Sequence, residues 1–518
     1  MRQADKGGAT TILNTTDYIF EAEKQLSNSD FYKILPEDPS RLFQPKIDEL
    51  CQSVPTLATK IAELTPKASV VGTFYTLPKV HKLPKLITEA QQALPGVTPS
   101  DPENIRRSDI CKLARKLKLF PPCRPIISGI GTLTEHLSGY MDSVYSTLIN
   151  HIPSYIQDTT HFLRILNTIQ ALPINSLLVT MDVSSLYTNI PHDEGIIACQ
   201  NFLREHATNP TLGDDLGPIL RFILSNNYFS FNGKYYLQIN GTAMGTKMAP
   251  CYANIFMHEL EQEMLSTSPL KPSHYYRYID DIFFVWPHGE ESLKSFFDHV
   301  NSFHDSIKFS VEVSKHQISF LDVLVKLDGN SLTTSVYYKP TDIHMYLHFN
   351  SFHPHNLKSS IVYSQCLRLK RICSNPCDFK HQVSILTGYF LNVGYPLHLI
   401  RQGISRADKL SREDLLKYKS KSPNTRIPFV TSYNPLIKSF IRSIKQEFAV
   451  FQDDQSVGES FKVPPMLAFR QPPTLNFFSL PPDSPAQFPP PQAIFLAVNL
   501  DAKYAPIFPR HRGQDSQC

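Results

Sequence analysis

Three aspartates at the ends of apolar, strand-like segments could bind divalent metal ions. Asp280 and Asp281 lie inside the run HYYRYIDDIFFVW, and Asp182 follows the apolar residues of LLVTMD. Buried carboxylates are costly unless they are protonated, paired or bound to a cation. A hairpin turn alone would favour Asn-Gly, as at 232–233, and Asp182 alone would equally suit a helix cap or a turn. A cation with oxygen ligands explains the aspartate pair best, and Mg²⁺ is the expected ion, with Mn²⁺ as an alternative.

The spacing of these carboxylates suits nucleotidyl transfer. They form two strand-end groups separated by 98 residues, from 182 to 280. Two Mg²⁺ ions about 3.5–4 Å apart can activate a primer 3′ hydroxyl and stabilise the departing pyrophosphate. Mg²⁺ retains water and binds substrate phosphates, so a few carboxylates suffice as protein ligands.

The elements that must position the aspartates are predicted from local patterns. Residues 70–335 alternate strand-like and helix-like patterns with short turns, which indicates an α+β core. YFSFNGKYYLQ (228–238) predicts a β-hairpin with an Asn-Gly turn. Residues 132–148 predict a helix that opens with a capping box. A further helix is predicted at 246–265, with a proline in its first turns.

Composition restricts the class of protein. The chain has 518 residues, of which 42% are hydrophobic and 19% are charged, as in an ordinary globular protein. It contains no apolar run of the roughly 20 residues that a membrane span needs. Its nine cysteines form no CxxC pair, so we expect reduced thiols and no zinc site. The start has no signal-peptide core, and we expect an intracellular protein.

Basic residues are concentrated in one segment. Residues 339–438 contain 15 Lys or Arg and 5 Asp or Glu, a balance of +10, whereas the whole chain carries only +4. Such a segment indicates either a polyanion-binding surface or a solvated helical face. The histidines at 344–355 are interpreted as part of a polar surface rather than a zinc site. Twelve of the 41 prolines lie between 464 and 509, which predicts an extended or disordered tail.

The motifs that surround the aspartates resemble those of reverse transcriptases. YIDD looks like the Tyr-x-Asp-Asp box of that superfamily, and five further stretches follow the family's order: FYTLPKVHK, CRPIISGIGTLTE, TMDVSSLY, QINGTAMGTKMAP and SFLDVLV. ADKGGA, LPKVHK, the AMG…AP pattern and YLHFNSFHPHNLKSSIVYSQCLRLKRIC resemble more narrowly the Penelope-like retroelements. The likeness extends over about residues 4–478, with gaps.

The resemblance implies a role for each matched residue. Asp182, Asp280, Asp281 and the carbonyl of Val183 would hold two Mg²⁺ ions, with Asp281 as a supporting ligand. Lys79 and Arg124 would bind the incoming triphosphate, and Tyr187 would exclude a 2′ hydroxyl. Gln238 would hold backbone near the template, or make only a strand hydrogen bond. Gly241 and Gly245 would allow close backbone approach beside the nascent base pair.

The resemblance also implies a right-hand polymerase fold with an antiparallel-sheet palm, fingers and a helical thumb. Residues 1–160 would form an N-terminal segment and fingers with an insertion at 83–122, and residues 161–335 the palm with an inserted part of the fingers. Residues 336–440 would form the basic thumb, which grips the duplex backbone, and residues 441–518 the Pro-rich tail.

The expected activity is therefore RNA-directed DNA synthesis by a retroelement enzyme, with an RNA template, a DNA primer, dNTPs and no membrane, in the nucleus. The competing interpretations are a catalytically silent nucleic-acid-binding fold, a telomerase-like enzyme and an RNA-dependent RNA polymerase. Residues 83–122 could be an insertion in the fingers or a retained intron, and either could disturb the pairing of Lys79 with Arg124. A GIY-YIG endonuclease is not found, and the abrupt start at ADKGG suggests a fragment or a decayed copy.

Overall fold

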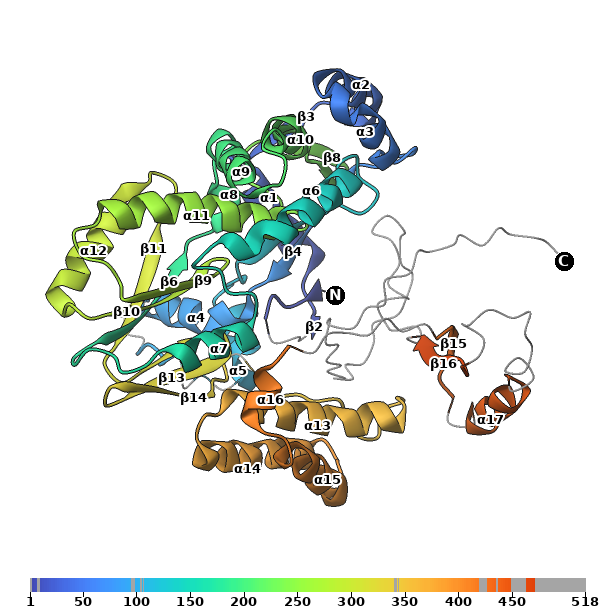
Figure 1. Ribbon diagram of the computed structural model, residues 1–518. Coiled ribbons are helices and arrows are strands. Elements are labelled where there is room, and N and C mark those ends of the chain that lie inside the picture. The colour runs from blue at the N-terminus through green and yellow to red at the C-terminus, as the bar shows by residue number, and fades with distance from the viewer. Residues whose placement is uncertain are drawn as a thin grey trace. The chain divides into compact units, whose positions relative to one another are not determined.

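The computed structural model describes residues 2–6, 10–94, 98–102, 105, 107–339, 342, 344–418, 426–434, 437–448 and 463–470. Two compact units are present, and the second begins at His344. Helices and mainly antiparallel sheets, with one parallel strand pair, build the first unit, which confirms the α+β class (Figure 1). None of the described helices combines the length and the apolar character that a membrane crossing requires. No disulfide joins the cysteines of the described ranges.

The central sheet carries the predicted aspartates. Its four strands lie in the order β11 (Phe309–Ser314), β6 (Leu177–Val183), β10 (Asp281–Trp286) and β9 (His274–Tyr278), and every neighbouring pair is antiparallel. Both inner strands are apolar on both faces, because the sheet is covered on both sides.

One face of this sheet packs on helices that cross it. Its buried residues share a core with the helices α6 (Glu135–Leu148), α9 (His192–His206), α10 (Leu212–Ser225), α11 (Ala249–Thr267) and α12 (Glu290–Phe303). Figure 1 shows α11 running along the sheet. On the other face, Phe283 packs against Phe162 of α7 (Thr159–Thr168) and against Phe320. Phe320 belongs to a small antiparallel sheet of β12 (Gln317–Phe320), β13 (Val323–Asp328) and β14 (Ser331–Val336).

A second, five-stranded sheet carries the predicted phosphate-binding residues. Its order is β3 (Tyr32–Leu35), β8 (Lys234–Gln238), β7 (Tyr228–Phe231), β4 (Gly72–Pro78) and β5 (Cys123–Ser128). The rings of Phe74, Phe229 and Tyr236 stack on one face at centroid distances of 5.5 Å. The Asn232-Gly233 hairpin is confirmed, since both residues have positive φ, at 48° and 72°.

The 83–122 insertion forms a helical extension of this sheet. Its described part contains α4 (Leu83–Gln92) and α5 (Arg107–Lys116), which share a small apolar cluster around Leu83, Ile87 and Ala114. The insertion does not separate the strands that flank it, because β4 and β5 pair from Thr73↔Ser128 to Pro78↔Cys123.

The predicted capping box at the start of α6 was wrong. The helix begins at Glu135, and Thr132 lies in the preceding turn, where its hydroxyl donates to the Gly129 carbonyl at 2.8 Å. The Glu135 carboxylate accepts from the Gly131 amide at 2.7 Å and pairs with Lys247 at 3.4 Å. The long-range lysine and the turn amide thus replace the local reciprocal bonds that the sequence pattern suggested. The helix predicted at 246–265 is confirmed as α11, with Pro250 in its first turn.

The second unit is mainly helical. It contains α13 (His355–Ile372), α14 (Pro376–Asn392), α15 (Leu397–Asp408) and α16 (Arg412–Leu416). His344 stacks on Tyr389 with a centroid distance of 4.1 Å. The sequence did not predict β15 (Pro428–Ser432), which pairs in parallel with β16 (Met466–Arg470), nor α17 (Ile437–Glu447). Most of the predicted Pro-rich tail, from residue 471 onward, lies outside the described residues.

The remaining elements lie in the first unit. They are the strands β1 (Arg2–Gln3) and β2 (Thr10–Thr11), the α-helices α1 (Thr15–Leu26), α2 (Phe43–Ser53), α3 (Ala58–Leu64) and α8 (Leu186–Asn189), and four 3₁₀ helices, Pro39–Leu42, Pro55–Leu57, Val80–Lys82 and Ile149–His151.

Candidate polymerase active site

The three aspartates meet at one end of the central sheet. Asp281, the first residue of β10, lies opposite Asp182 of β6 in the antiparallel register. Directly opposed residues on neighbouring strands point to the same face of a sheet. Asp182 is exposed and Asp281 is half-buried. The structure therefore brings together the two strand ends that the sequence placed 98 residues apart.

Asp280 lies in the tight turn between β9 and β10. The turn consists of Ile279 and Asp280, because Tyr278 already pairs with Asp281. The carbonyl of Asp280 accepts a hydrogen bond from the Val183 amide at 3.0 Å, which ties the turn to the end of β6. Ile279 has φ of +58°. A β-branched residue in the left-handed region is strained, by about 1–3 kcal/mol, and needs surrounding contacts to hold it there.

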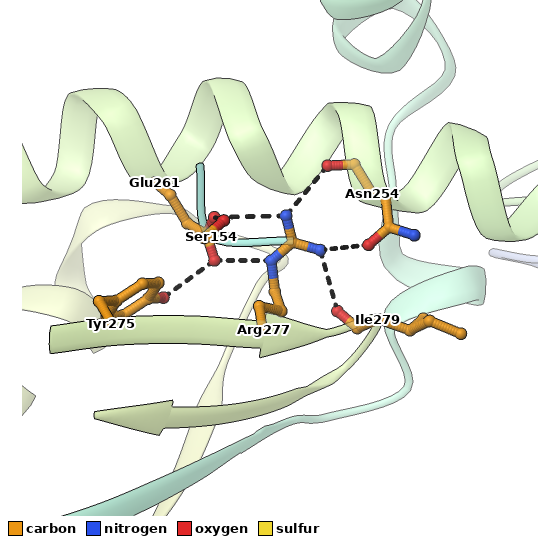
Figure 2. A network of polar contacts seen from close by, with 6 residues as sticks. All are labelled: Ser154, Asn254, Glu261, Tyr275, Arg277 and Ile279. Atoms are coloured by element: carbon orange, nitrogen blue, oxygen red, sulfur yellow. Dashed lines mark hydrogen bonds and ion pairs between the residues drawn. The ribbon is translucent and has the colours of Figure 1, made fainter. Parts of the chain in front are cut away.

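A buried arginine supplies one of those contacts (Figure 2). Arg277 of β9 has an exposed fraction of 0%, and its Nε donates to Glu261 of α11 at 2.6 Å. Its Nη1 donates to the Asn254 side chain at 2.6 Å and to the Ile279 carbonyl at 3.3 Å. The arginine thus connects the turn before Asp280 to the helix behind the sheet.

The buried ion pair has enough partners to offset its desolvation. The Glu261 carboxylate also accepts from the Ser154 hydroxyl at 2.7 Å and from the Tyr275 hydroxyl at 3.0 Å. The Arg277 amide donates to the Ser154 carbonyl, and the Arg277 carbonyl accepts from the Ile156 amide. Buried pairs persist only when the remaining donors and acceptors are satisfied in this way.

Sequence analysis did not identify this arginine as a functional residue. The available signal was its place in HYYRY, a strand that is otherwise aromatic, since arginine is almost never fully buried unless it is paired. Its partner Glu261, in contrast, lies on the face of a helix whose pattern gave no indication of a buried charge.

The carboxylates strongly affect one another electrostatically. Burial, followed by the charges of Asp280 and Asp182, raises the pKa of Asp281 to about 6. Asp182 is exposed as a residue, but partial desolvation of its carboxylate, followed by the charge of Asp280, also raises its pKa above the usual range. Lys6 and Lys339 oppose both shifts. Like charges held close together disfavour ionisation, and a cation between them would relieve the repulsion.

These residues fit Mg²⁺ in donor type and charge. All three offer carboxylate oxygens, the ligands that Mg²⁺ prefers, and Mg²⁺ completes its shell with water and substrate phosphates. In the described ranges, no three His, Cys, Asp or Glu side chains are grouped as a metal site, and this finding includes the three aspartates. Asp182, Asp280 and Asp281 are the residues that would hold the ions.

The two predicted phosphate-binding cations belong to neighbouring strands or their ends: Lys79 directly follows β4, and Arg124 lies in β5. Arg124 of β5 is opposite Leu77 of β4, and the Lys79 amide at the end of β4 donates to the Pro122 carbonyl at 2.8 Å. Burial, followed by the charges of Lys82 and Arg124, lowers the pKa of Lys79. The insertion therefore does not separate the backbone positions of Lys79 and Arg124, and their joint role in phosphate binding stays a prediction.

Tyr187 packs beside the aspartates. It lies in α8, just after β6, and burial, followed by the charge of Asp280, raises the pKa of its hydroxyl to about 12. Its carbonyl accepts from the Thr242 amide at 2.6 Å. That contact requires a glycine next to it, because a Cβ at Gly241 would lie 2.5 Å from the backbone of Thr188.

Gly245 and Gln238 contact other parts of the chain. Gly245 has φ of +134°, and a Cβ there would lie 2.2 Å from the Ile127 carbonyl oxygen of β5. Gln238 is buried, and its side-chain amide accepts from Asn227 at 3.0 Å and donates to the Asn240 carbonyl at 2.9 Å. In this structure Gln238 therefore fixes the loop that follows β8.

Two family models match the chain. Residues 130–356 match the model of the reverse transcriptase (RNA-dependent DNA polymerase) family, and residues 345–405 match that of an animal helix-turn-helix domain. The first match contains all three aspartates, and the second contains most of α13, α14 and α15. No curated protein matches the sequence.

Several solved polymerase structures share a distant likeness. The telomerase of Candida albicans in complex with a fragment of telomeric RNA is 11% identical, with a TM-score of 0.43, and the match covers 82% of this chain and 68% of that one. The RNA-dependent RNA polymerase of a human picobirnavirus is 11% identical, with a TM-score of 0.42 and coverage of 77% and 82%. An apo telomerase of Candida tropicalis has 11% identity and a TM-score of 0.33, and the chain spans only 60% of its length.

The family match and the site agree in position. Residues 130–356 contain the antiparallel sheet, and its strands β6 and β10 place Asp182 opposite Asp281. In its position in the chain and its antiparallel pairing, this sheet corresponds to the palm that the resemblance to reverse transcriptases predicts. Residues 130–356, less than half of the chain, thus form a segment that matches the reverse transcriptase (RNA-dependent DNA polymerase) family model and contains the candidate site.

Proposed function

We propose that the protein is an RNA-directed DNA polymerase of a retroelement that extends a primer by two-metal nucleotidyl transfer. The observation that carries this proposal is the register of Asp281 opposite Asp182 inside the matched reverse transcriptase domain. Polymerase chemistry needs strand-end carboxylates from two separate segments, and this pairing provides them.

Each residue has a defined task in this proposal. Two bound Mg²⁺ ions would acidify the primer 3′ hydroxyl and stabilise the negative charge of the phosphates and pyrophosphate. Asp182 and Asp280 would be the main ligands, with the Val183 carbonyl and Asp281 in support. Lys79 and Arg124 bind the phosphates of the dNTP and hold its α-phosphate in line with the 3′ oxygen.

Selection of the nucleotide is assigned to Tyr187. Its ring lies just after β6 and next to the charge of Asp280, which is where the sugar of a nucleotide bound at the metals would lie. The ring would clash with a 2′ hydroxyl and so favour deoxynucleotides. This role argues against an RNA product, and therefore against the RNA polymerase interpretation.

The nucleic acid partners are an RNA template and a DNA primer. The basic 339–438 segment, with 15 Lys or Arg against 5 Asp or Glu, would contact the duplex backbone as a thumb. The match of residues 345–405 to a helix-turn-helix model supports nucleic acid binding by this segment. The sequences of the motifs, such as LPKVHK and the AMG…AP pattern, support the Penelope-like branch. A retroelement of this kind would act in the nucleus.

Primer extension with defined substrates tests the proposal. The full chain should extend a DNA primer on an RNA template with dNTPs and Mg²⁺, and chelation of Mg²⁺ with EDTA should stop extension. Ribonucleotides should be incorporated much more slowly. If the chain binds the primer–template duplex but adds no nucleotide under any of these conditions, it is a silent nucleic-acid-binding fold and the proposal fails.

A further inference from the structure

An N-terminal arm, residues 2–6, is anchored on the sheet that carries Lys79 and Arg124. The Arg2 guanidinium lies 5.1 Å from the ring centre of Tyr18 and 5.8 Å from that of Tyr75 in β4. Ala4 is buried, with an exposed fraction of 5%. The arm therefore has a fixed position next to β4, although none of its residues belongs to the matched reverse transcriptase domain.

Asp5 of the arm is buried against Arg124. Its side chain is 4% exposed, and its Oδ1 lies 2.6 Å from the Arg124 Nε, out of line for a hydrogen bond. Its amide donates to the Pro78 carbonyl at 3.0 Å, one residue before Lys79. In the described part of the chain, the other carboxylate oxygen, Oδ2, has no hydrogen-bond partner. The Arg124 side chain remains 39% exposed, so the pair leaves part of it open to solvent.

Lys6 follows Asp5 and is exposed. Because the Asp5 backbone is bound next to Lys79, Lys6 must lie close to the same cations. The charge of Lys6 acts both on His81, near the phosphate-binding cations, and on the aspartates. After burial, Lys6 is the largest contributor to the lowered pKa of His81, and it also opposes the raised pKa of Asp182 and Asp281. Lys6 thus follows the anchored Asp5 next to Lys79, and its charge acts on the groups around it.

We propose that this arm is part of the binding site for the triphosphate of the incoming nucleotide. Asp5 is a positioning residue that orients the Arg124 guanidinium, and Lys6 contacts the phosphates directly. The inference rests on the proposed function and adds two residues that the matched domain does not contain.

The charge distribution around the arm favours an anion. Four positive charges act on one another in this region, those of Lys6, Lys79, Lys82 and Arg124. The negative charge of Asp5 offsets only part of their repulsion. A polyphosphate would relieve this repulsion with charge-assisted hydrogen bonds. Lysine suits a phosphate contact of this kind, because its ammonium is a compact point charge on a flexible stem.

Binding of inorganic triphosphate to the full chain tests this inference without requiring polymerisation. Isothermal titration calorimetry should show binding to the wild type and an affinity about tenfold lower for Lys6→Gln, which corresponds to about 1.4 kcal/mol. Lys6→Arg should retain most of the affinity because it keeps the charge. Lys67→Gln, at an exposed lysine elsewhere in the same unit, should bind as the wild type does.

Two results would overturn the inference: no measurable binding of triphosphate to the wild type, or equal affinities for Lys6→Gln and Lys67→Gln. Lys6 is exposed, so its substitution should not unfold the chain, and an unchanged melting temperature will verify this. Failure of the proposed function would differ from either result, because a silent fold would still bind triphosphate through Lys6 while it extends no primer.

Asp5→Asn separates the positioning role from a simple structural one. If Asp5 orients Arg124, this variant should raise the KM for dNTP severalfold in primer extension and leave the affinity for the primer–template duplex unchanged. Equal KM values for Asp5→Asn and the wild type would overturn the role given to Asp5. An Asp5→Asn variant with a lower melting temperature but the wild-type KM for dNTP would also overturn this role, because Asp5 would then act only in stability.

Discussion

Asp281 lies directly opposite Asp182 across β10 and β6, and the Asp280 carbonyl accepts the Val183 amide at 3.0 Å. The two contacts join the ends of strands that are distant in sequence, and they fix the separation of the carboxylates through backbone pairing. Such backbone-held geometry is what metal-dependent transfer of a nucleotide requires, because the ligands must be in place before the substrate arrives.

The Arg277 network should contribute strongly to stability. Arg277→Met leaves the Glu261 carboxylate buried without its counter-ion, and we expect the free energy of unfolding to fall by about 3–5 kcal/mol. Arg204 and Asp214 form an exposed pair at 2.7 Å, so Arg204→Met should cost less than about 1 kcal/mol. Urea denaturation of both variants checks the difference, and equal losses would show that the buried network is not a stabilising contact.

The sequence predicted the elements whose signals are local. The Asn232-Gly233 hairpin, the helix that contains Pro250 and the strand ending at Asp182 were all identifiable from short patterns. Arg277 could not be assigned in the same way, because its partners Glu261 and Asn254 come from a helix whose contacts with β9 depend on the tertiary fold.

Backbone conformation and long-range pairs explain the remaining differences. The positive φ of Ile279 has no sequence signal, since isoleucine normally avoids it. The start of α6 was misplaced because Glu135 bonds to the Gly131 amide and the distant Lys247 instead of forming a capping box with Thr132. The contact of Asp5 with Arg124 joins residues on either side of the insertion, and no periodicity links them.

Binding of Mg²⁺ should depend on pH. The raised pKa of Asp281, about 6 against an ordinary 3.8, means that the folded chain holds this proton more tightly than the unfolded chain does. The stability that this group contributes is therefore present at low pH and is lost as the pH rises from 3.8 to about 6. Mg²⁺ competes with that proton, so millimolar Mg²⁺ should raise the melting temperature more at about pH 7.5 than at about pH 5.

Two variants that each replace one aspartate by asparagine serve as the test and the control for this measurement. Asp281→Asn should reduce the pH dependence of the Mg²⁺ effect, whereas Asp298→Asn, at an exposed position on α12, should not. An equal rise in melting temperature at both pH values, in the wild type, would contradict the assignment of Asp281 to the metal site.

The close approach of Gly245 to β5 predicts that larger residues are not tolerated there. A Cβ would lie 2.2 Å from the Ile127 oxygen, in a backbone conformation of φ +134°, and we expect Gly245→Ala to cost at least about 1–3 kcal/mol. Gly139→Ala in α6 meets only the flexible Lys247 side chain, at 3.4 Å, and should be neutral or stabilise by about 0.5–1 kcal/mol. Thermal unfolding compares the two variants, and a Gly245→Ala chain as stable as the wild type would disprove the steric argument.

Tyr187 should control the choice of sugar. Tyr187→Val opens space near Asp280, and the preference for dNTP over NTP should fall by about tenfold or more. Tyr187→Phe keeps the ring and should retain the preference. The ratio of kcat/KM for dTTP and UTP measures this effect. A Tyr187→Val enzyme with wild-type discrimination would assign the tyrosine to core packing alone.

The rate of RNA-templated dNTP addition by Asp182→Asn, relative to Asp298→Asn, tests the central claim most directly. Asparagine keeps the shape of the side chain and removes the charge that would hold the metal ions. We predict that Asp182→Asn lowers the rate by more than about 100-fold at a melting temperature no lower than that of the wild type, while Asp298→Asn keeps the wild-type rate. Extension by Asp182→Asn at the wild-type rate would contradict the account.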